Sequence, residues 1–225
     1  MIERRVLLAG TLAVPFLGSP AIAGRIDAGA EKGSEDQFRS ISSAVANLLP
    51  APDVRTQLAY VYAVAAHVLA GAEAPPAKLF PMGGFARGVE IGPIAREPNF
   101  VVIGYRALPG AKVPPHNHPN YSVVTIGTEG MATIRFFESQ NAPPMNSPDP
   151  FELEETRAVQ LRPGDVAIVT PARDNIHMFE AGPQGAQWID ITTSHGPDLG
   201  FSYLDLGASE LNHLGRMSAK WTKFS

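Results

Sequence analysis

Apolar residues in the first third of the chain recur at the spacing of an amphipathic helix. One such face lies between the capping-box pair Ser34 and Gln37 and the prolines at 50 and 52, and it consists of Phe38, Ile41, Val45, Leu48 and Leu49. A second run from Asp53 to Leu69 has the same period, and Gly71 follows it as a stop signal. We therefore expect two N-terminal α-helices in a helical segment over residues 34–72.

From Phe100 onward the pattern changes to short runs of β-branched and aromatic residues, with glycine and proline between them. Seven such runs predict strands: Phe100–Tyr105, Tyr121–Ile126, Ala132–Phe137, Val166–Val169, Ile176–Phe179, Trp188–Thr192 and Phe201–Leu206. Many short strands separated by turns indicate an all-β sandwich or barrel, which we expect over residues 73–210. The proline-rich stretch 139–150 is expected to be an exposed inter-strand loop, and residues 211–225 a C-terminal tail.

The first 23 residues have the pattern of an export signal. Arg4 and Arg5 precede an apolar run over 6–17, and Ala21-Ile22-Ala23 suits a signal peptidase. The paired arginines resemble a twin-arginine signal, and residues 24–33 would link it to the first helix. Because the run is short for a permanent bilayer span, we expect an exported, periplasmic protein rather than an uncleaved anchor. Cleavage after Ala23 would leave 225 − 23 = 202 residues and no stable membrane span.

Composition narrows the chemistry that the chain can perform. It has no cysteine, which excludes disulfides, a cysteine nucleophile and a thiolate ligand. Its formal net charge is −4 and its basic residues are scattered, so the sequence has no electrostatic footprint for nucleic acid. A nucleic-acid partner is therefore not expected, and the sequence does not predict an oligomeric state.

Three histidines form a candidate metal site. His116 and His118 flank a single residue, and in a strand such a pair points to the same face of the sheet. His177 follows a turn-like run over 170–175 and leads into a predicted strand. Three neutral imidazoles would leave coordination positions open for a bidentate substrate and dioxygen, although imidazole alone does not select among iron, zinc, copper and nickel.

The stretch around the histidine pair matches a known motif at all but one position. From Gly110 to Gly130 it follows the first cupin motif: glycine, five residues, HxH, four residues, glutamate, six residues and glycine. Val123 stands where the motif has its glutamate, and a valine side chain cannot bind a metal. The predicted ligand set therefore contains no carboxylate. A bound Fe(II) would stay formally dicationic, which favours an anionic thiolate as incoming ligand.

The histidine segments also resemble the thiol dioxygenase family that contains cysteamine dioxygenase and the plant cysteine oxidases. The similarity lies in Val113–Pro119, Asn175–Phe179 and Ile189–Ile191, within a region of roughly residues 35 to 206. It implies a cupin double-stranded β-helix, or jelly-roll barrel, in which three histidines bind Fe(II): His116, His118 and His177. It further implies that the protein oxidises a thiol to a sulfinic acid with O2.

The same resemblance implies two further catalytic residues. Asp190 falls near a family aspartate and could orient a substrate ammonium group or a ligand imidazole; the alternative is an exposed strand residue. Tyr203 resembles a family tyrosine in a late strand, and its alternative is a place in the core. Tyr121 stands where the family tends to have methionine, and the segment around His195 lacks a tyrosine of the plant enzymes.

Taken with the resemblance, these patterns predict a non-haem Fe(II)-dependent dioxygenase whose substrate is a small aminothiol or the N-terminal cysteine of a peptide. Two alternatives stay open. One is another three-histidine, metal-dependent cupin enzyme, such as a non-thiol oxygenase or an isomerase. The other is a non-catalytic cupin that binds a metal or a ligand.

Overall fold

The computed structural model describes residues 79–82, 86–96, 100–139, 141–145, 147–195, 202–207 and 216–222. The expected signal segment (1–23), linker (24–33) and helical segment (34–72) lie outside the described residues. Within the described part, no helix is long and apolar enough to cross a membrane.

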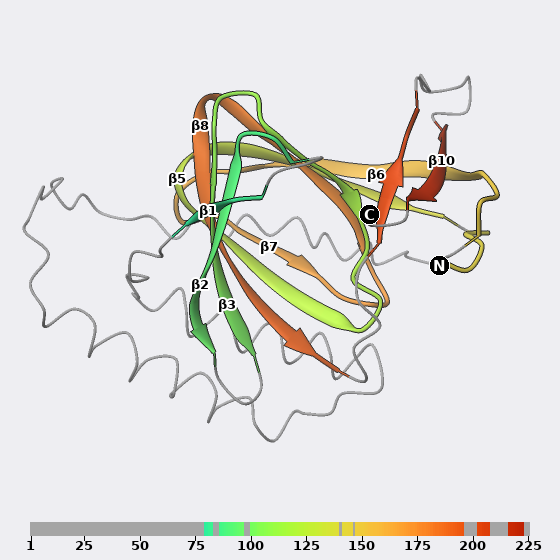
Figure 1. Cartoon of the computed structure of the whole chain (residues 1–225), viewed down its shortest axis with the longest axis horizontal. Helices are drawn as coiled ribbons and strands as arrows, with labels where there is room; N and C mark the ends of the chain where they lie inside the picture. Colours follow the sequence, from blue (N-terminus) through green and yellow to red (C-terminus); the bar gives the residue numbers. More distant parts are fainter. Residues whose placement is uncertain are drawn as a thin grey trace, which may run out of the picture.

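The described residues form one antiparallel sheet that closes into a barrel (Figure 1). The strands are β1 (Phe80–Pro81), β2 (Val89–Arg96), β3 (Val101–Ala107), β4 (Lys112–His116), β5 (Tyr121–Glu138), β6 (Phe151–Leu161), β7 (Val166–Val169), β8 (Ile176–Ser194), β9 (Tyr203–Asp205) and β10 (Arg216–Thr222). Their order is β1-β2-β3-β8-β4-β9-β10-β6-β5-β7, and a further pairing of β8 with β5 closes the ring. The expected all-β jelly-roll barrel is confirmed.

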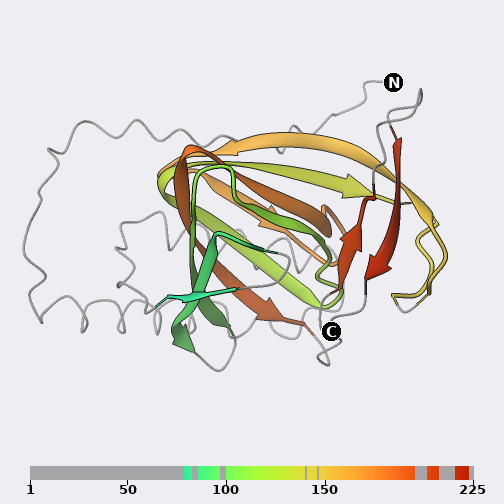
Figure 2. The same cartoon turned by 45° about the horizontal axis from the view of Figure 1, so that its top comes forward.

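Two long strands, β5 and β8, curve around the barrel and pair with each other (Figure 2). Each joins two runs that the sequence separates, for example Tyr121–Ile126 and Ala132–Phe137 in β5. The glycines between the runs do not end the strand, because register shifts there bend β5 while its pairing with β8 continues. At Gly130, φ is 64° and a Cβ would collide with the carbonyl of Gly185, so the bend requires glycine.

The sequence analysis did not predict strands β6 and β10. β6 alternates buried and exposed positions, and its exposed ones are mostly polar or charged. β10 lies in the segment expected to be a C-terminal tail, yet it pairs with both β6 and β9. Its Trp221 indole donates a 2.9 Å hydrogen bond to the carbonyl of Pro143, which fastens the 139–150 loop to the sheet. That loop is mostly exposed over its described residues, as predicted.

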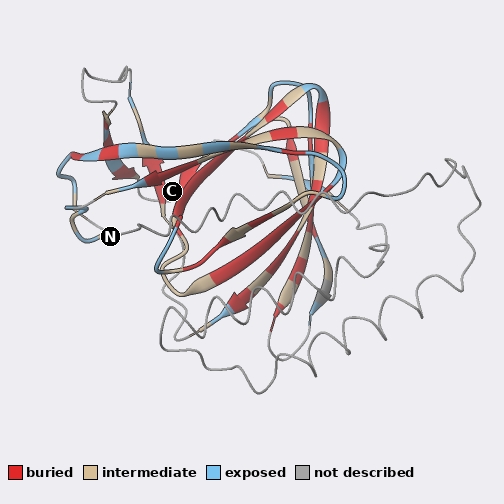
Figure 3. Ribbon diagram, turned by 180° about the vertical axis from the view of Figure 1, so that it is seen from behind, coloured by how far each residue is buried: buried red, intermediate tan, exposed pale blue. Residues whose placement is uncertain are grey.

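Buried positions alternate with partly buried ones along β7 and most of β3, whereas residues 122–127 of β5 are all buried. Figure 3 shows the buried stretches in red. One hydrophobic cluster inside the barrel contains an aromatic stack of Tyr105, Trp188 and Phe179. The ring centroids are 5.1 Å apart for Tyr105 and Trp188, and 4.9 Å apart for Trp188 and Phe179, with nearly parallel planes. Phe179 in turn contacts His177 at 5.5 Å between centroids, so the stack leads to the histidines.

Candidate metal centre

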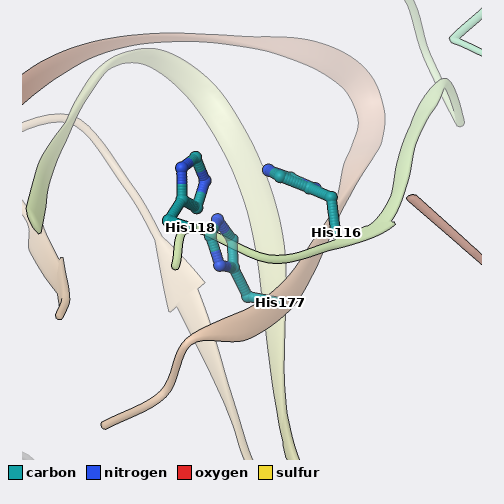
Figure 4. A group of neighbouring side chains, drawn as sticks. All are labelled: His116, His118 and His177. Atoms are coloured by element: carbon teal, nitrogen blue, oxygen red, sulfur yellow. The ribbon is translucent and has the colours of Figure 1, made fainter. Parts of the chain in front are cut away.

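The three histidines meet where β4 ends against β8 and β9 (Figure 4). His116 is the last residue of β4 and pairs with His177 on one side and with Tyr203 on the other. His118 lies beyond the end of the strand, so strand alternation does not set its direction as the sequence analysis assumed. The turn that follows β4 nevertheless brings its ring to the other two.

The separations within this group suit a single ion. One candidate ligand nitrogen from each histidine lies within 4.8 Å of the others. Ring centroids are 4.5 Å apart for His116 and His177, 5.0 Å for His116 and His118, and 5.1 Å for His118 and His177. Nitrogens that each lie about 2.1 Å from one ion are roughly 3.0 to 3.4 Å apart at octahedral or tetrahedral angles, so the rings would move closer together when an ion binds.

The tautomer of His116 suits a metal ligand. Its Nδ1 lies 2.8 Å from the carbonyl oxygen of Pro114, an atom that can only accept a hydrogen bond. Nδ1 therefore carries the proton and donates it to that carbonyl. Nε2 consequently keeps its lone pair, and the ring has a fixed orientation.

Burial keeps the three rings neutral. Desolvation lowers the pKa of His116 from 6.5 to about 4. Desolvation also lowers the pKa of His118 and of His177 well below the ordinary value, and repulsion between the neighbouring rings adds to the shift. Since a neutral imidazole is the form that binds a metal, the residues present fit a bound cation at neutral pH.

Metal binding should therefore persist in mild acid. Protons compete with the metal only below a ligand's own pKa, so we expect Co(II) affinity to stay nearly constant from about pH 8 to about pH 6 and to fall toward pH 4. A synthetic peptide of residues 113–119 is the matched control, because exposed imidazoles have a pKa near 6.5 and lose affinity below it. Titrations followed by visible absorbance measure both. Identical pH profiles for protein and peptide would contradict the burial argument.

The two residues expected to be catalytic both lie inside the barrel. Tyr203 is 5% exposed, and its ring centroid is 5.4 Å from that of His116. Asp190 is 9% exposed, so the alternative of an exposed strand residue is wrong. The Thr125 hydroxyl donates a 2.6 Å hydrogen bond to Oδ1 of Asp190, whereas burial raises the pKa of that carboxyl to about 7. Their catalytic roles stay predictions.

Sequence reasoning missed Tyr105, which lies on β3 and stacks on Trp188. Burial raises the pKa of its phenol well above the ordinary value, and the nearby Asp190 and Tyr203 raise it further. The charges of these three side chains therefore influence one another. No local signal could have found this group, because the three residues lie on separate strands that only the sheet order brings together.

The remaining positions singled out from the sequence lie around the site. Tyr121 borders it, with its ring centroid 6.4 Å from that of His118. His195 lies outside the three-histidine group, and its Nε2 shares a 2.6 Å hydrogen bond with Oγ of Ser122 on β5. Val123 is 1% exposed and pairs with Val169, so it fills the core at the glutamate position of the motif. Among the described residues, no carboxylate joins the histidine group.

Fold and site together define a β-barrel protein with a three-histidine group that could hold a metal ion. Residues 98–198, which include all three histidines, match the family model described as Cupin. The match agrees with the β-barrel that these residues form. A comparison with curated protein sequences gave no match.

Solved structures with a similar fold include KdgF from Halomonas sp., which is 17% identical over 50% of this chain and 84% of its own, with a TM-score of 0.37. The polyketide cyclase RemF from Streptomyces resistomycificus is 14% identical over 61% of this chain and 86% of its own, with a TM-score of 0.43. Pro-11S globulin of pumpkin is 17% identical over 59% of this chain but 31% of its own, with a TM-score of 0.41. At these identities and TM-scores the similarities say nothing about the reaction of this chain.

Proposed function

We propose that this protein is a non-haem Fe(II)-dependent dioxygenase that oxidises a small aminothiol, or the N-terminal cysteine of a peptide, to a sulfinic acid. The observation that carries the proposal is the group of three histidines whose ligand nitrogens lie within 4.8 Å of one another, with no carboxylate among them in the described part of the chain. A ligand set without negative charge favours an anionic thiolate at the ion. The resemblance of the histidine segments to thiol dioxygenases supports the same reaction.

His116, His118 and His177 would hold the ion, and Fe(II) in this position would supply thiol deprotonation and dioxygen activation. The protein's own contribution is to orient the substrate. Asp190 accepts one hydrogen bond from Thr125 at Oδ1, and a carboxylate has further lone pairs for a substrate ammonium group. Its pKa, raised to about 7 by burial, falls again when a cation lies beside it, so an amine substrate would stabilise the carboxylate form.

Two phenols in the barrel would act as hydrogen-bond donors. Burial raises the pKa of Tyr203 and of Tyr105, so both keep their protons at neutral pH. Tyr203, whose ring centroid lies 5.4 Å from that of His116, would donate to a group bound at the histidines. The stacked rings of Trp188 and Phe179 form an apolar wall that would exclude water from the reacting thiol.

The charges inside the barrel favour an amine over a carboxylate on the substrate. The buried ionisable side chains of the described residues are His116, His177, Tyr203, Asp174 and Asp190, and no lysine or arginine is among them. A substrate carboxylate would therefore find no buried cation there, whereas an ammonium group finds Asp190. This supports cysteamine or an N-terminal cysteine in preference to free cysteine.

Oxygen uptake with matched thiols tests the proposal. The Fe(II)-loaded protein should consume O2 with cysteamine or a peptide that begins with cysteine, and the product should gain about 32 Da, as expected for a sulfinic acid. 2-Mercaptoethanol, which has a hydroxyl in place of the amine, should react more slowly because it offers Asp190 no cation. The Zn(II)-loaded protein is the redox-inert control. If the protein binds metal tightly but consumes no O2 with any thiol, it is a binding module. If it consumes O2 with a substrate that is not a thiol, it is another kind of oxygenase.

We also propose that the protein acts in the periplasm. The support is the signal-like pattern of residues 1–23 alone. Cell fractionation together with the mass of the mature N-terminus tests it, and an intact N-terminus in the cytoplasmic fraction would contradict it.

A further inference from the structure

A side-chain hydrogen bond connects the second metal-site histidine to the segment of the third. The backbone of His118 lies beyond the end of β4, so no strand pairing holds it. Its N–H donates to Oδ1 of Asn175 at 2.6 Å. Asn175 lies two residues before His177 and immediately before β8. The amide of Asn175 therefore links two ligands that are far apart in the chain.

Asn117, the residue between the paired histidines, is held by hydrogen bonds to Ser202. Its N–H donates to the carbonyl of Ser202 at 3.1 Å, and the N–H of Ser202 donates to Oδ1 of Asn117 at 2.8 Å. Asn117 is 5% exposed, so both hydrogen bonds form in a site that excludes water. The backbone of the next residue, His118, makes two hydrogen bonds: its N–H donates to Asn175, and its carbonyl accepts from the N–H of Tyr121 at 3.3 Å.

The loop that contains Asn175 is stabilised by its own contacts. Thr170 and Arg173 exchange backbone hydrogen bonds of 3.0 and 3.1 Å, which close the turn. Asp174 has φ of 56°, an uncommon conformation for a residue with a side chain, and Arg157 donates to its carboxylate at 2.8 Å. The same guanidinium lies 3.9 Å over the ring of Phe136. The amide nitrogen of Asn175 also donates to the carbonyl of Pro171 at 3.4 Å, so contacts within the loop help to set the position of the amide.

We propose that Asn175 is a positioning residue of the metal centre, because its amide oxygen sets the distance between His118 and His177 before an ion binds. Without this acceptor, the hydrogen bond from the His118 N–H to the segment of His177 is lost, and the turn after β4 is held less firmly at the second ligand. The ion would then have to order that ligand itself, which lowers its affinity. The inference rests on the three-histidine metal site but not on thiol oxidation, so it can fail or succeed independently of the proposed reaction.

Co(II) binding to the full chain tests this role. We expect Asn175→Ala to weaken Co(II) affinity about 10- to 100-fold, the usual effect of removing a group that orients a ligand, and to change the visible absorption bands of bound Co(II). Asn175→Asp keeps the acceptor oxygen and should retain both the affinity and the spectrum. Asn141→Ala, at an exposed asparagine of the 139–150 loop, is the matched control and should have no effect.

Two further measurements separate positioning from other causes. The charge added in Asn175→Asp could attract Co(II) through space. The titrations are therefore made at low and at high salt, because salt screens this long-range attraction but not the effect of the hydrogen bond. If Asn175→Ala does not fold, Asn175→Leu, with a similar shape but no acceptor, replaces it. Wild-type affinity and spectrum in the variants without an acceptor would overturn the proposal, as would equal losses in Asn175→Asp. If the unmodified chain fails to bind Co(II), the metal site itself is refuted.

Discussion

Replacing His177 with alanine should abolish both metal retention and thiol oxidation. His177 is 2% exposed and lies 4.5 Å from His116 and 5.1 Å from His118 between ring centroids, so it completes the group. Its loss leaves two imidazoles and, among the described residues, no carboxylate to replace the third. We expect metal affinity to fall by more than about 100-fold, beyond the loss caused by a group that only orients a ligand.

The measurements are metal content after gel filtration and O2 consumption with cysteamine. His195→Ala is the matched control, because it removes a histidine that lies outside the group and shares a hydrogen bond with Ser122. The cavity in His177→Ala also destabilises the core, so His177→Gln, which fills more of the space, is measured beside it, and circular dichroism checks that each variant is folded. Retention of stoichiometric iron and full activity by either His177 variant would refute the metal centre described above.

The fold could be predicted from the sequence where its signals are local. Runs of β-branched and aromatic residues with turns between them indicated an all-β barrel, and Val166–Val169 matches β7 residue for residue. The sequence could not show that Gly127 and Gly130 bend one long strand instead of ending two, because the same glycines suit a turn. It also did not reveal β10, whose role depends on pairing with β6 and β9 far away in the chain.

The candidate site, too, could be predicted only where its features lie in short stretches of the sequence. The HxH spacing, the third histidine and the absent glutamate at Val123 are local features, and together they pointed to the group that the structure brings together. The residues that surround the three histidines cannot be recognised from a short stretch of sequence. Asn175 and Tyr105 become visible only when the turn after β4 meets the start of β8, and when β3 pairs with β8. Sequence reasoning therefore found the three histidines that could hold an ion, but not the neighbours that we propose position them.

Replacing Asp190 with asparagine should stabilise the metal-free protein above neutral pH. Burial raises the pKa of Asp190 from 3.8 to about 7, so between these values the folded state keeps a proton that the unfolded chain has lost. The contribution of Asp190 to stability therefore falls as pH rises from about 4 to about 7, and above that range it is a penalty on the order of a few kcal/mol. Asparagine has nearly the same shape, can still accept from Thr125, and carries no charge.

The buried histidines have the opposite pH dependence. Their folded-state pKa values lie below 6.5, so the unfolded chain takes up protons first and stability falls as pH drops from about 6.5 toward 4. In the unmodified protein the two contributions partly cancel across this window. Without the carboxyl of Asp190 only the histidine contribution remains. The stability of Asp190→Asn should therefore rise more steeply with pH than that of the unmodified protein.

Urea unfolding of the metal-free proteins at about pH 4.5, 6 and 7.5 measures this difference in slope. Asp149→Asn, at an exposed position of the 139–150 loop, is the control for the loss of a surface carboxylate. The stability gained in Asp190→Asn should be accompanied by a loss of function, because the variant cannot hold a substrate ammonium group and should no longer prefer cysteamine over 2-mercaptoethanol. Parallel stability curves would show that the carboxyl is not buried as described. A gain in stability with unchanged thiol preference would mean that Asp190 lies inside the barrel but does not bind the amine.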